Sequence, residues 1–255
     1  MRIIAVINQK GGVGKTTTTA NLAHAFAIKG YAVTGIDMDP QGHLAAHWGC
    51  YRRDDNGVDK ILLGEKTIPQ VAVSARDRLH LVPAGKGLKD IERGAGDGLL
   101  GSRLKEALAL VAATQDFTFI DCPPASGLLI DYVLSVADEV IIPVAADYLA
   151  LRGLSDMVET LSDFEQKYEK TFNRWVVVTR FHSRRKLSWE VRDKLLEYFP
   201  DNMLATSIRE VSVLAECPSF GKTAFEYKSA NHGAFDYASL ARDLLNGECY
   251  RGQER

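Results

Sequence analysis

Residues 10–17, Lys-Gly-Gly-Val-Gly-Lys-Thr-Thr, constrain the fold of this chain more than any other feature of its sequence. They follow a short apolar run, Ile3–Ile7, and open a helix-prone stretch, Thr16–Lys29, which stops at Gly30. A strand, a glycine-rich turn and a helix in this order form a cradle in which backbone N–H groups and the helix N-terminus converge on phosphate oxygens. The sequence therefore predicts an α/β fold that binds a phosphorylated ligand.

Each residue of this turn has an expected part in holding a nucleotide. Lys15 can reach the β- and γ-phosphates, and the Thr16 hydroxyl can ligate Mg²⁺. The other cofactor-binding positions are expected to be Gly11, Gly12, Val13, Gly14 and Thr17. The alternative, a glycine-rich turn with an incidental Lys-Thr pair, leaves the strand before it and the helix after it unexplained.

The motif departs from the standard G-x-x-x-x-G-K-[ST] form at two positions. Gln9 stands where the first glycine is expected, and a second lysine, Lys10, stands beside it. A further cation at the mouth of the loop is unfavourable unless it meets negative charge, and Lys15 already serves the chain's own nucleotide. The nucleotide of a facing subunit is a useful target for Lys10, and a solvated loop lysine is the alternative.

In this motif the chain resembles the deviant Walker A ATPases, the group that includes ParA-type partition proteins and MinD. In that family the lysine equivalent to Lys10 crosses a two-fold interface and contacts the partner's phosphates, so that ATP holds two subunits together. The resemblance spans the chain from Met1 to about Leu245. It implies ATP and Mg²⁺ as cofactors, an ATP-dependent homodimer, and catalytic roles for Lys10 and Lys15.

Along the rest of the chain, short β-branched runs alternate with apolar-periodic segments. The expected strands are Ile3–Ile7, Ala32–Asp37, Leu79–Val82, Phe117–Asp121, Glu139–Val144 and Trp175–Thr179, with a weaker one at Leu204–Ile208. The expected helices are Thr16–Lys29, Arg103–Ala113, Leu128–Val136, Leu154–Tyr168, Trp189–Tyr198 and Phe235–Leu245. This alternation predicts a doubly wound, mostly parallel sheet with helices on both faces, the α/β fold of P-loop NTPases.

Length and composition fit one ATPase domain over residues 1–255, without an N-terminal helix-turn-helix extension. A polar surface excursion is expected at Arg52–Lys60. The net charge of −2 gives no global reason to bind a polyanion, so any nucleic-acid binding must come from a local patch. The four cysteines lack C-x-x-C spacing, and neither a signal peptide nor an apolar run of transmembrane length is present. We therefore expect a cytoplasmic protein.

The expected strand Ala32–Asp37 ends in Asp37-Met38-Asp39-Pro40-Gln41-Gly42. Ligands of open parallel sheets bind at the carboxyl ends of the strands, so both carboxylates should face the phosphate loop. The segment matches the D-x-D-P-Q-G switch of the family, which implies that Asp39 is catalytic, orients the attacking water and belongs to the magnesium site. Asp37 is expected to support the magnesium shell or the turn, and a turn without catalytic function is the alternative.

A second acidic strand end lies at Phe117–Asp121, followed by Cys122-Pro123-Pro124. An apolar strand ending in Asp is the Walker B pattern, in which the carboxylate holds Mg²⁺, often through water. The Cys-Pro-Pro segment resembles the second switch of the family, in which prolines stiffen a loop that senses the γ-phosphate. Cys122 is expected to pack in the core, because no histidine is placed to activate it as a nucleophile. The predicted magnesium ligands are thus Thr16, Asp39 and Asp121.

Arg180 and Phe181 directly follow the expected strand Trp175–Thr179. In relatives this strand end lies near the adenine, so the resemblance implies that both residues contact the base. The chain departs from the family nearby, because Ile208-Arg209-Glu210 stands where relatives commonly have Ile-Pro-Arg.

The densest basic run of the chain is Arg184-Arg185-Lys186, with Arg192 and Lys194 on the following helix. Such a run is either a solvated charged face or a surface that contacts the phosphates of double-stranded DNA. The resemblance favours DNA, because an arginine matching Arg184 belongs to the nonspecific DNA-binding surface of ParA-type proteins. A second basic position of that surface falls on the apolar Val213 in this chain.

The resemblance implies a slow, partner-stimulated ATPase that binds DNA nonspecifically as an ATP dimer on the nucleoid. It would position a plasmid, a chromosome or a protein assembly through a ParB-like or cargo-specific adaptor. A MinD-like membrane regulator needs a C-terminal amphipathic helix, whereas residues 246–255 are polar and interrupted by glycines. No membrane partner is therefore expected. An electron carrier like nitrogenase reductase would need cysteines that bridge a cluster, and an ATP-binding scaffold would not need Asp39 and Asp121.

Overall fold

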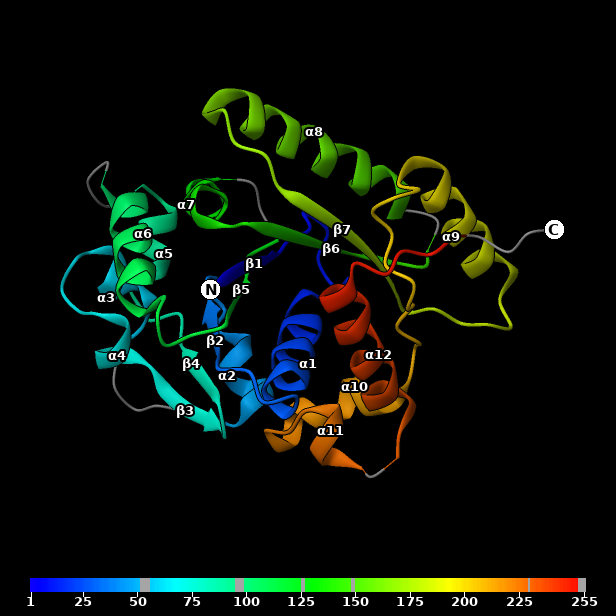
Figure 1. Ribbon diagram of the computed structural model, residues 1–255, viewed down its shortest axis with the longest axis horizontal. Helices are drawn as coiled ribbons and strands as arrows, with labels where there is room; N and C mark the ends of the chain where they lie inside the picture. Colours follow the sequence, from blue (N-terminus) through cyan, green and yellow to red (C-terminus); the bar gives the residue numbers. More distant parts are fainter. Residues whose placement is uncertain (51–55, 95–98, 125–126, 148–149, 229, 252–255) are drawn as a thin grey trace.

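A seven-stranded sheet forms the centre of the computed structural model, which describes residues 1–50, 56–94, 99–124, 127–147, 150–228 and 230–251 (Figure 1). In the order β3-β4-β2-β5-β1-β6-β7, every neighbouring pair is parallel except β3 with β4. The strands are β1 (Arg2–Val6), β2 (Val33–Asp37), β3 (Val73–Arg76), β4 (Leu79–Val82), β5 (Phe117–Asp121), β6 (Glu139–Ala145) and β7 (Asn173–Thr179). This sheet confirms the predicted architecture.

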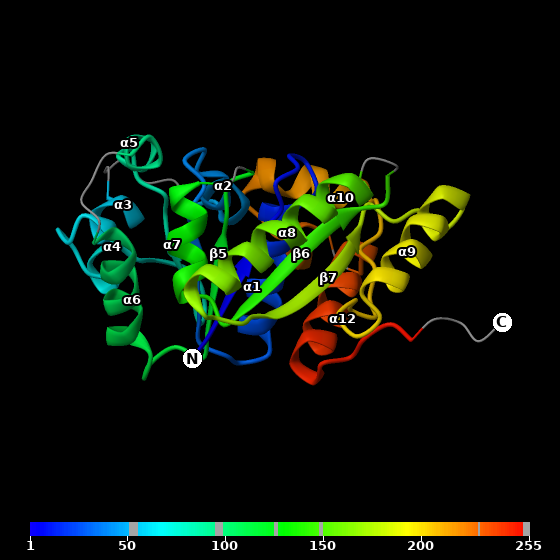
Figure 2. The same ribbon diagram turned by 90° about the horizontal axis from the view of Figure 1, so that it is seen from above.

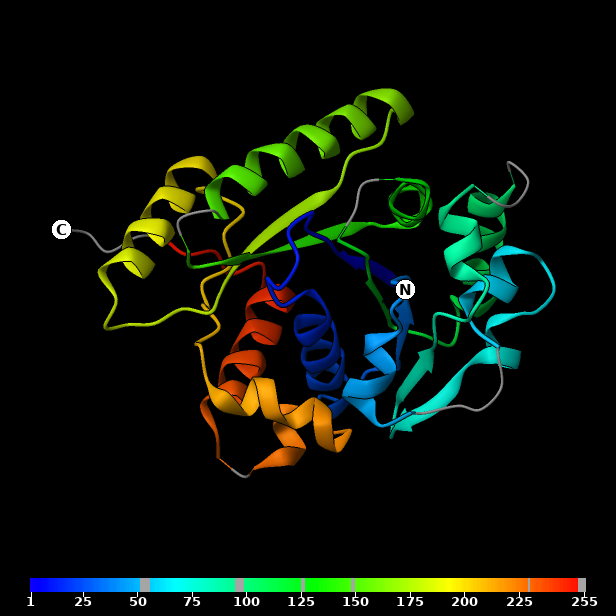
Figure 3. The same cartoon turned by 180° about the vertical axis from the view of Figure 1, so that it is seen from behind.

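Helices cover both faces of the sheet, as Figures 1 and 3 show from opposite sides. One face carries α1 (Lys15–Ile28), α2 (His43–Trp48), α10 (Ser212–Glu216), η1 (Cys217–Phe220), α11 (Ala224–Tyr227) and α12 (His232–Asn246). The other carries α3 (Val58–Leu62), α4 (Ile68–Val71), α5 (Leu88–Glu92), α6 (Leu100–Val111), α7 (Leu128–Val136), α8 (Ala150–Tyr168) and α9 (Lys186–Tyr198). All six predicted helices are present. Within the described ranges, no helix combines the length and the apolar content of a membrane span.

β5 shows why the strands read as continuous apolar runs. Phe117 and Phe119 point to one face, where their ring centroids lie 4.6 and 5.2 Å from that of Phe26 on α1. Ile120, which follows Phe119 in β5, belongs to the core on the opposite face. Alternate side chains thus enter two cores, so a strand that is covered on both sides has no polar face.

The carboxyl ends of β1, β2 and β5 lie side by side and bring the predicted site residues to one edge of the sheet. In the strand register, Asp121 is opposite both Asp37 of β2 and Val6 of β1. The chain after Val6 leads directly into the phosphate loop. The short helices α2, α5 and α10 gather along the same edge, at the top of Figure 2.

The predicted weak strand at Leu204–Ile208 is wrong. The N–H groups of Leu204 and Ile208 donate to the carbonyls of Val176 and Val178 at 2.9 and 2.8 Å, but the segment forms only isolated bridges. Between these contacts the Ala205 N–H donates to the Glu248 carbonyl at 3.1 Å instead. The C-terminal segment therefore interrupts the ladder that Leu204–Ile208 would have formed with β7.

The predicted surface excursion at Arg52–Lys60 is wrong at its C-terminal end, and residues 52–55 lie outside the described residues. Val58 begins α3 and is fully buried, and Asp59 is 1% exposed. The Asp59 carboxylate accepts hydrogen bonds from the backbone N–H groups of Lys60 and Gly87, both at 2.9 Å. Polar composition suggested exposure here, whereas the carboxylate is buried because it serves backbone donors.

Gly35 of β2 is expected to be essential for packing, because a side chain there meets Trp48. An ideal Cβ at Gly35 would lie 2.3 Å from Trp48 Cη2, and Trp48 is 2% exposed with its indole N–H bound to the Ala20 carbonyl at 3.2 Å. Gly35→Ala should lower the free energy of unfolding by about 1–3 kcal/mol in urea titrations. Gly11→Ala, where a Cβ meets nothing within 4 Å, is the matched control. Equal stability of the two variants would contradict this packing argument.

Candidate nucleotide-binding site

The phosphate loop joins β1 to α1 at the carboxyl edge of the sheet. Gly12 and Gly14 adopt positive φ angles of 74° and 92°, although a Cβ at either position would meet nothing within 4 Å. Glycine is therefore favoured at both positions by the backbone conformation, and not because a side chain would clash with a neighbour. Gly14 precedes the first residue of α1 and, having no side chain, leaves the first N–H groups of the helix for a ligand.

Lys15 lies against this loop. Its side chain is largely buried, and its Nζ donates to the carbonyl of Lys10 at 3.3 Å. Burial lowers the pKa of Lys15, whereas the carboxylates of Asp121 and Asp39 oppose that change. The Lys15 ammonium has thus lost much of its contact with water, and phosphate oxygens at this position would stabilise its positive charge instead.

Asp37 holds the turn that follows β2. Its fully buried carboxylate accepts hydrogen bonds from the N–H groups of Asp39 at 3.1 Å and Leu44 at 3.0 Å. The Asp39 carboxylate in turn accepts from the Gln41 N–H at 2.9 Å. Two roles are expected for Asp37, support of the magnesium shell or of the turn, and these hydrogen bonds support the turn. Burial raises the pKa of Asp37 well above its ordinary value, and the nearby Asp121 adds to that rise.

Asp121 is the second fully buried carboxylate at this edge. Its Oδ1 accepts from the Thr19 hydroxyl at 3.2 Å, whereas its Oδ2 is buried without a hydrogen-bond partner in the described part of the chain. Burial raises the pKa of Asp121 to about 7, although the hydroxyl of Thr16 and the ammonium of Lys15 oppose the rise. A buried oxygen without a partner is unfavourable, so this position suits a cation.

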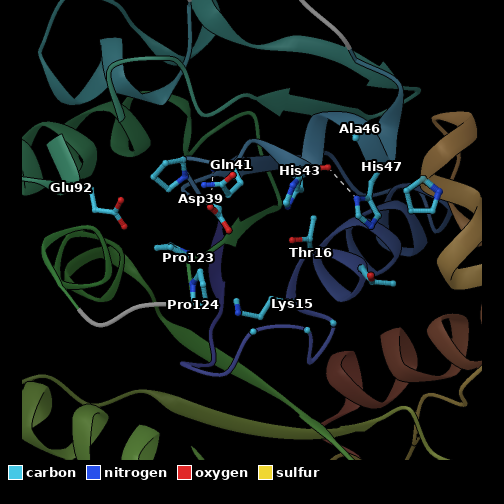
Figure 4. A pocket seen from close by; sticks show the side chains of 16 residues that line it. Lys15, Thr16, Asp39, Gln41, His43, Ala46, His47, Glu92, Pro123 and Pro124 are labelled. Carbon is cyan, nitrogen blue, oxygen red and sulfur yellow. Dashed lines mark hydrogen bonds between the residues drawn. The ribbon is translucent and has the colours of Figure 1, made fainter. Parts of the chain in front are cut away.

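The oxygen atoms of Thr16, Asp39 and Asp121 fit Mg²⁺, which prefers hard oxygen ligands and retains several waters. Lys15, Thr16 and Asp39 face one space in Figure 4. Among the described side chains, no three His, Cys, Asp or Glu residues are placed to hold a metal by themselves. An ion at this site would therefore depend on phosphate oxygens and water for the rest of its ligands.

Lys15, Thr16 and Asp39 line a cleft of about 700 Å³, whereas Asp121 lies fully buried and is not among its lining residues. Pro123 and Pro124 of the predicted second switch also line it, as do three residues that the sequence did not single out: His43, His47 and Glu92 (Figure 4). The His47 Nδ1 donates to the His43 carbonyl at 3.0 Å, and burial lowers the pKa of His47. His43 and His47 share one face of α2, so their i, i+4 spacing after the D-x-D-P-Q-G turn was the available signal.

Gln9 and Lys10, the two residues that depart from the standard motif, both contact the β6–α8 part of the same chain. Lys10 Nζ donates to both carboxylate oxygens of Asp147, at 2.7 and 2.9 Å. Gln9 Nε2 donates to the Thr160 hydroxyl of α8 at 2.9 Å. The extra lysine thus has an acidic partner within its own subunit, which the sequence did not reveal.

A second cleft, of about 350 Å³, lies on the other side of the phosphate loop. Arg180 lines it in a left-handed conformation with φ 52°. The structure does not bring Phe181 to this cleft, because its ring packs edge-on to Trp189 with the centroids 5.2 Å apart. The wall opposite the loop is formed instead by Ile208, Arg209, Glu210, Val211, Ser212, Leu214, Ala215 and Tyr237.

The basic run at the start of α9 is exposed but partly paired. Arg185 binds Glu210 at 2.9 Å, and Lys186 lies 3.3 Å from Glu190. Exposed pairs of this kind contribute little, so phosphates can replace them. Within the described residues, the Arg184 guanidinium makes no hydrogen bond or ion pair.

Arg192, which the sequence grouped with this run, belongs to the interior of the α9 region. Its guanidinium lies over the rings of Trp189 and Tyr250, 4.2 and 4.3 Å from their centroids, and Nη2 donates to the Tyr250 hydroxyl at 2.6 Å. Lys194 binds Glu197 at 2.8 Å. The free basic surface is therefore smaller than the sequence suggested.

Known proteins match this chain over its full length. A family model described as an AAA domain matches residues 1–174. ParA, the chromosome partitioning protein of Myxococcus xanthus, is 34% identical over 262 residues, which cover 100% of this chain and 91% of that protein. The sporulation initiation inhibitor Soj of Bacillus subtilis is 36% identical over 248 residues, covering 95% and 98%. The chain belongs to the ParA/Soj family.

A solved structure agrees with this membership of the ParA/Soj family. It bears the name cobyrinic acid a,c-diamide synthase, comes from Mycobacterium smegmatis and contains bound ADP and magnesium. It is 30% identical and superposes with a TM-score of 0.81 over 96% of this chain and 94% of that chain. The two chains therefore share one fold along almost their entire length.

Asp121→Asn is expected to stabilise the protein increasingly as pH rises from 5 to 7, measured by urea unfolding without nucleotide or Mg²⁺. The pKa of Asp121 is raised to about 7, so in this window the folded state keeps a proton that the unfolded state releases. Wild-type stability then falls with pH by up to about 1.4 kcal/mol per unit, and the variant escapes that loss. Its advantage over wild type should grow by about 2 kcal/mol between the two pH values.

Asp77→Asn, at an exposed turn, is the control, since its carboxylate is in water in both states. If the free energies of unfolding of Asp121→Asn and wild type differ by a constant amount from pH 5 to 7, the Asp121 carboxyl is not protonated in the folded state.

Proposed function

We propose that this chain is a partitioning ATPase that binds ATP with Mg²⁺, hydrolyses it slowly, and uses ATP binding to switch between a monomer and a homodimer. One ATPase domain spans residues 1–255 in this proposal. The observation that carries it is the buried, unpartnered Oδ2 of Asp121 beside Thr16 and Lys15 in the described part of the chain. This site is complete only when a cation and phosphates enter it. The ADP and magnesium bound in the solved structure from Mycobacterium smegmatis support an adenine nucleotide and this metal.

In the proposed reaction, the chain supplies electrostatic stabilisation and positioning. Lys15 and the first N–H groups of α1 neutralise the β- and γ-phosphates, which is the main contribution of such loops to phosphoryl transfer. Thr16, Asp39 and Asp121 would hold Mg²⁺, which supplies further charge neutralisation when bound. Asp39 orients the attacking water, and Asp37 fixes the turn that carries Asp39.

The proposed homodimer depends on Lys10. Its Nζ leaves Asp147 and contacts the phosphates of the facing subunit, so ATP joins the two chains. The cost is modest, because the lysine and aspartate side chains of this pair are 30% and 43% exposed. The gain is a charge-assisted contact to a multiply charged ligand.

The ATP dimer is proposed to bind double-stranded DNA nonspecifically through Arg184, Arg185 and Lys186, and so to associate with the nucleoid in the cytoplasm. A ParB-like or cargo-specific adaptor would stimulate hydrolysis and release. Dimerisation presents two copies of this small basic patch, so two weak contacts with one DNA molecule give a higher overall affinity than either alone. The relatives named for chromosome partitioning support this function over a MinD-like membrane-associated regulator.

Lys10→Ala should retain ATP binding but lose ATP-dependent dimers, because it removes the contact to the facing subunit and, within its own chain, only the partly exposed ion pair with Asp147. Lys15→Ala should weaken ATP binding more than about tenfold, since it removes a charge-assisted contact within the chain. Calorimetry measures the affinity, and light scattering with ATP and Mg²⁺ measures the dimer. Lys29→Ala, an exposed lysine at the far end of α1, is the control. Dimers of normal affinity in Lys10→Ala would exclude the proposed exchange.

Arg184→Ala/Arg185→Ala should weaken binding of the ATP-loaded protein to random-sequence duplex DNA. The slope of log K against log[salt] should shrink by about 0.9 for each phosphate that the variant no longer neutralises. Lys29→Ala/Arg78→Ala removes the same charge from the amino-terminal edge of the sheet and should leave the slope unchanged. A salt titration with an unchanged slope in Arg184→Ala/Arg185→Ala would reduce this run to a solvated face.

A further inference from the structure

The second cleft contains an arginine whose side chain is fixed from behind. Arg209 Nε donates to both carboxylate oxygens of Asp236, at 3.1 and 3.0 Å, and Nη2 donates to Oδ1 at 2.5 Å. The Arg209 backbone N–H donates to Oδ2 of the same carboxylate at 3.0 Å. One acid thus holds both the main chain and the guanidinium of this residue, which restricts the planar group to one orientation.

Burial of this pair is asymmetric. The Asp236 side chain is 5% exposed, whereas the Arg209 side chain is 35% exposed. Hydrogen bonding to Asp236 raises the pKa of Arg209, so the group stays charged. The ring of Phe235 lies beneath the guanidinium, 5.9 Å from its central carbon to the ring centroid. Carboxylate and ring therefore cover the back of the group, and the remaining surface is available on the side of the cleft that Arg209 lines.

The rest of the cleft is suited to a nucleoside. It shares Gly12, Gly14 and Thr17 with the phosphate cleft, so a ligand can extend from one into the other. Its wall combines apolar side chains, among them Ile208, Val211, Leu214 and Ala215, with the polar and charged side chains of Thr179, Arg180, Arg209, Glu210 and Ser212. In the described chain, the Nη1 of Arg209 has no hydrogen-bond partner, which leaves two N–H donors for acceptor atoms of a ligand.

We propose that Arg209, fixed by Asp236, is the residue that contacts the nucleotide base and determines base-dependent affinity. The inference rests on the proposed nucleotide function. A guanidinium that cannot rotate stacks on a flat heterocycle with little loss of conformational entropy, while its in-plane N–H groups are directed past the stacked ring toward other acceptor atoms of the ligand. Asp236 is a positioning residue that acts through Arg209.

The wall that carries Arg209 is also anchored to the sheet. The Ile208 N–H donates to the Val178 carbonyl at 2.8 Å, and the Glu210 N–H donates to the Phe181 carbonyl at 3.0 Å. Arg209 therefore stands between two residues bound to β7 or its extension, while its own N–H is bound to α12. A proline at position 209 could not make this last bond and would leave the Asp236 oxygen without its backbone donor.

The test compares ligands that share the phosphates and differ in the base. Arg209→Lys keeps a cation for Asp236 but lacks the planar, five-donor group. It should weaken Mg²⁺-ATP binding about tenfold, the order expected when one base interaction is removed, and leave Mg²⁺-tripolyphosphate binding unchanged. The ratio of UTP to ATP dissociation constants should fall, because the larger purine stacks over more of the guanidinium. Arg242→Lys, an exposed position on α12, the helix that carries Asp236, should alter none of these values.

Equal losses of affinity for ATP and tripolyphosphate would overturn the proposal, because they would place Arg209 among the phosphate-binding groups or in the general fold. Unchanged ATP affinity together with an unchanged UTP-to-ATP ratio would also overturn it. A wild-type protein that binds ATP no more tightly than tripolyphosphate would reject a base site while leaving the phosphate loop intact. Failure of the wild type to bind either ligand would reject the proposed function itself.

Discussion

Two carboxylates buried side by side at the carboxyl edge of the sheet organise the rest of this site. The pairing of β2 with β5 fixes Asp37 opposite Asp121, and neither position reaches water. Burial of two neighbouring acids is unfavourable unless each is compensated. Asp37 is compensated by backbone N–H groups of the turn and of α2, and these hydrogen bonds give the turn after β2 its shape. Asp121 is compensated only in part, by the hydroxyls of Thr16 and Thr19 and by the Lys15 ammonium, and its Oδ2 has no partner in the described part of the chain, which favours a cation at this position.

The phosphate loop is tied to the molecule on both sides of the sheet. α1 packs in one core, while Gln9 and Lys10 are bound to α8 and to the end of β6, respectively. The two residues that depart from the common motif are therefore the ones that connect the loop to the opposite layer. A change in their contacts would be transmitted to α8 through direct hydrogen bonds and not through general flexibility.

The sequence predicted the features that depend on local pattern, and it did not predict those that depend on distant partners. The phosphate loop, the six longer helices and six of the seven strands in the described chain follow from glycine positions and apolar periodicity. β3 was missed because its four residues, Val73–Arg76, are too short and too polar to be distinguished from a turn. The ion pair of Arg209 with Asp236 and the contact of Arg192 with the Tyr250 ring were invisible, because they join residues from segments far apart in sequence. Polar residues such as Asp59 are misread as exposed when their partners are backbone groups.

The bond between Lys10 and Asp147 has a consequence for the energetics of association. In a dimer of the proposed kind, each lysine exchanges one anionic counter-ion for another, so the number of compensated charges on it does not change. The free energy obtained is a difference between two attractions and not the full value of the new one. Such an exchange contributes more to selectivity between nucleotides than to the affinity of the dimer. A facing subunit with a bound nucleoside diphosphate, which carries less negative charge than the triphosphate, would compete poorly with the Asp147 carboxylate, 2.7 Å from Lys10 Nζ. In such a dimer, Asp147, which follows β6, would set a threshold that only the more highly charged nucleotide exceeds.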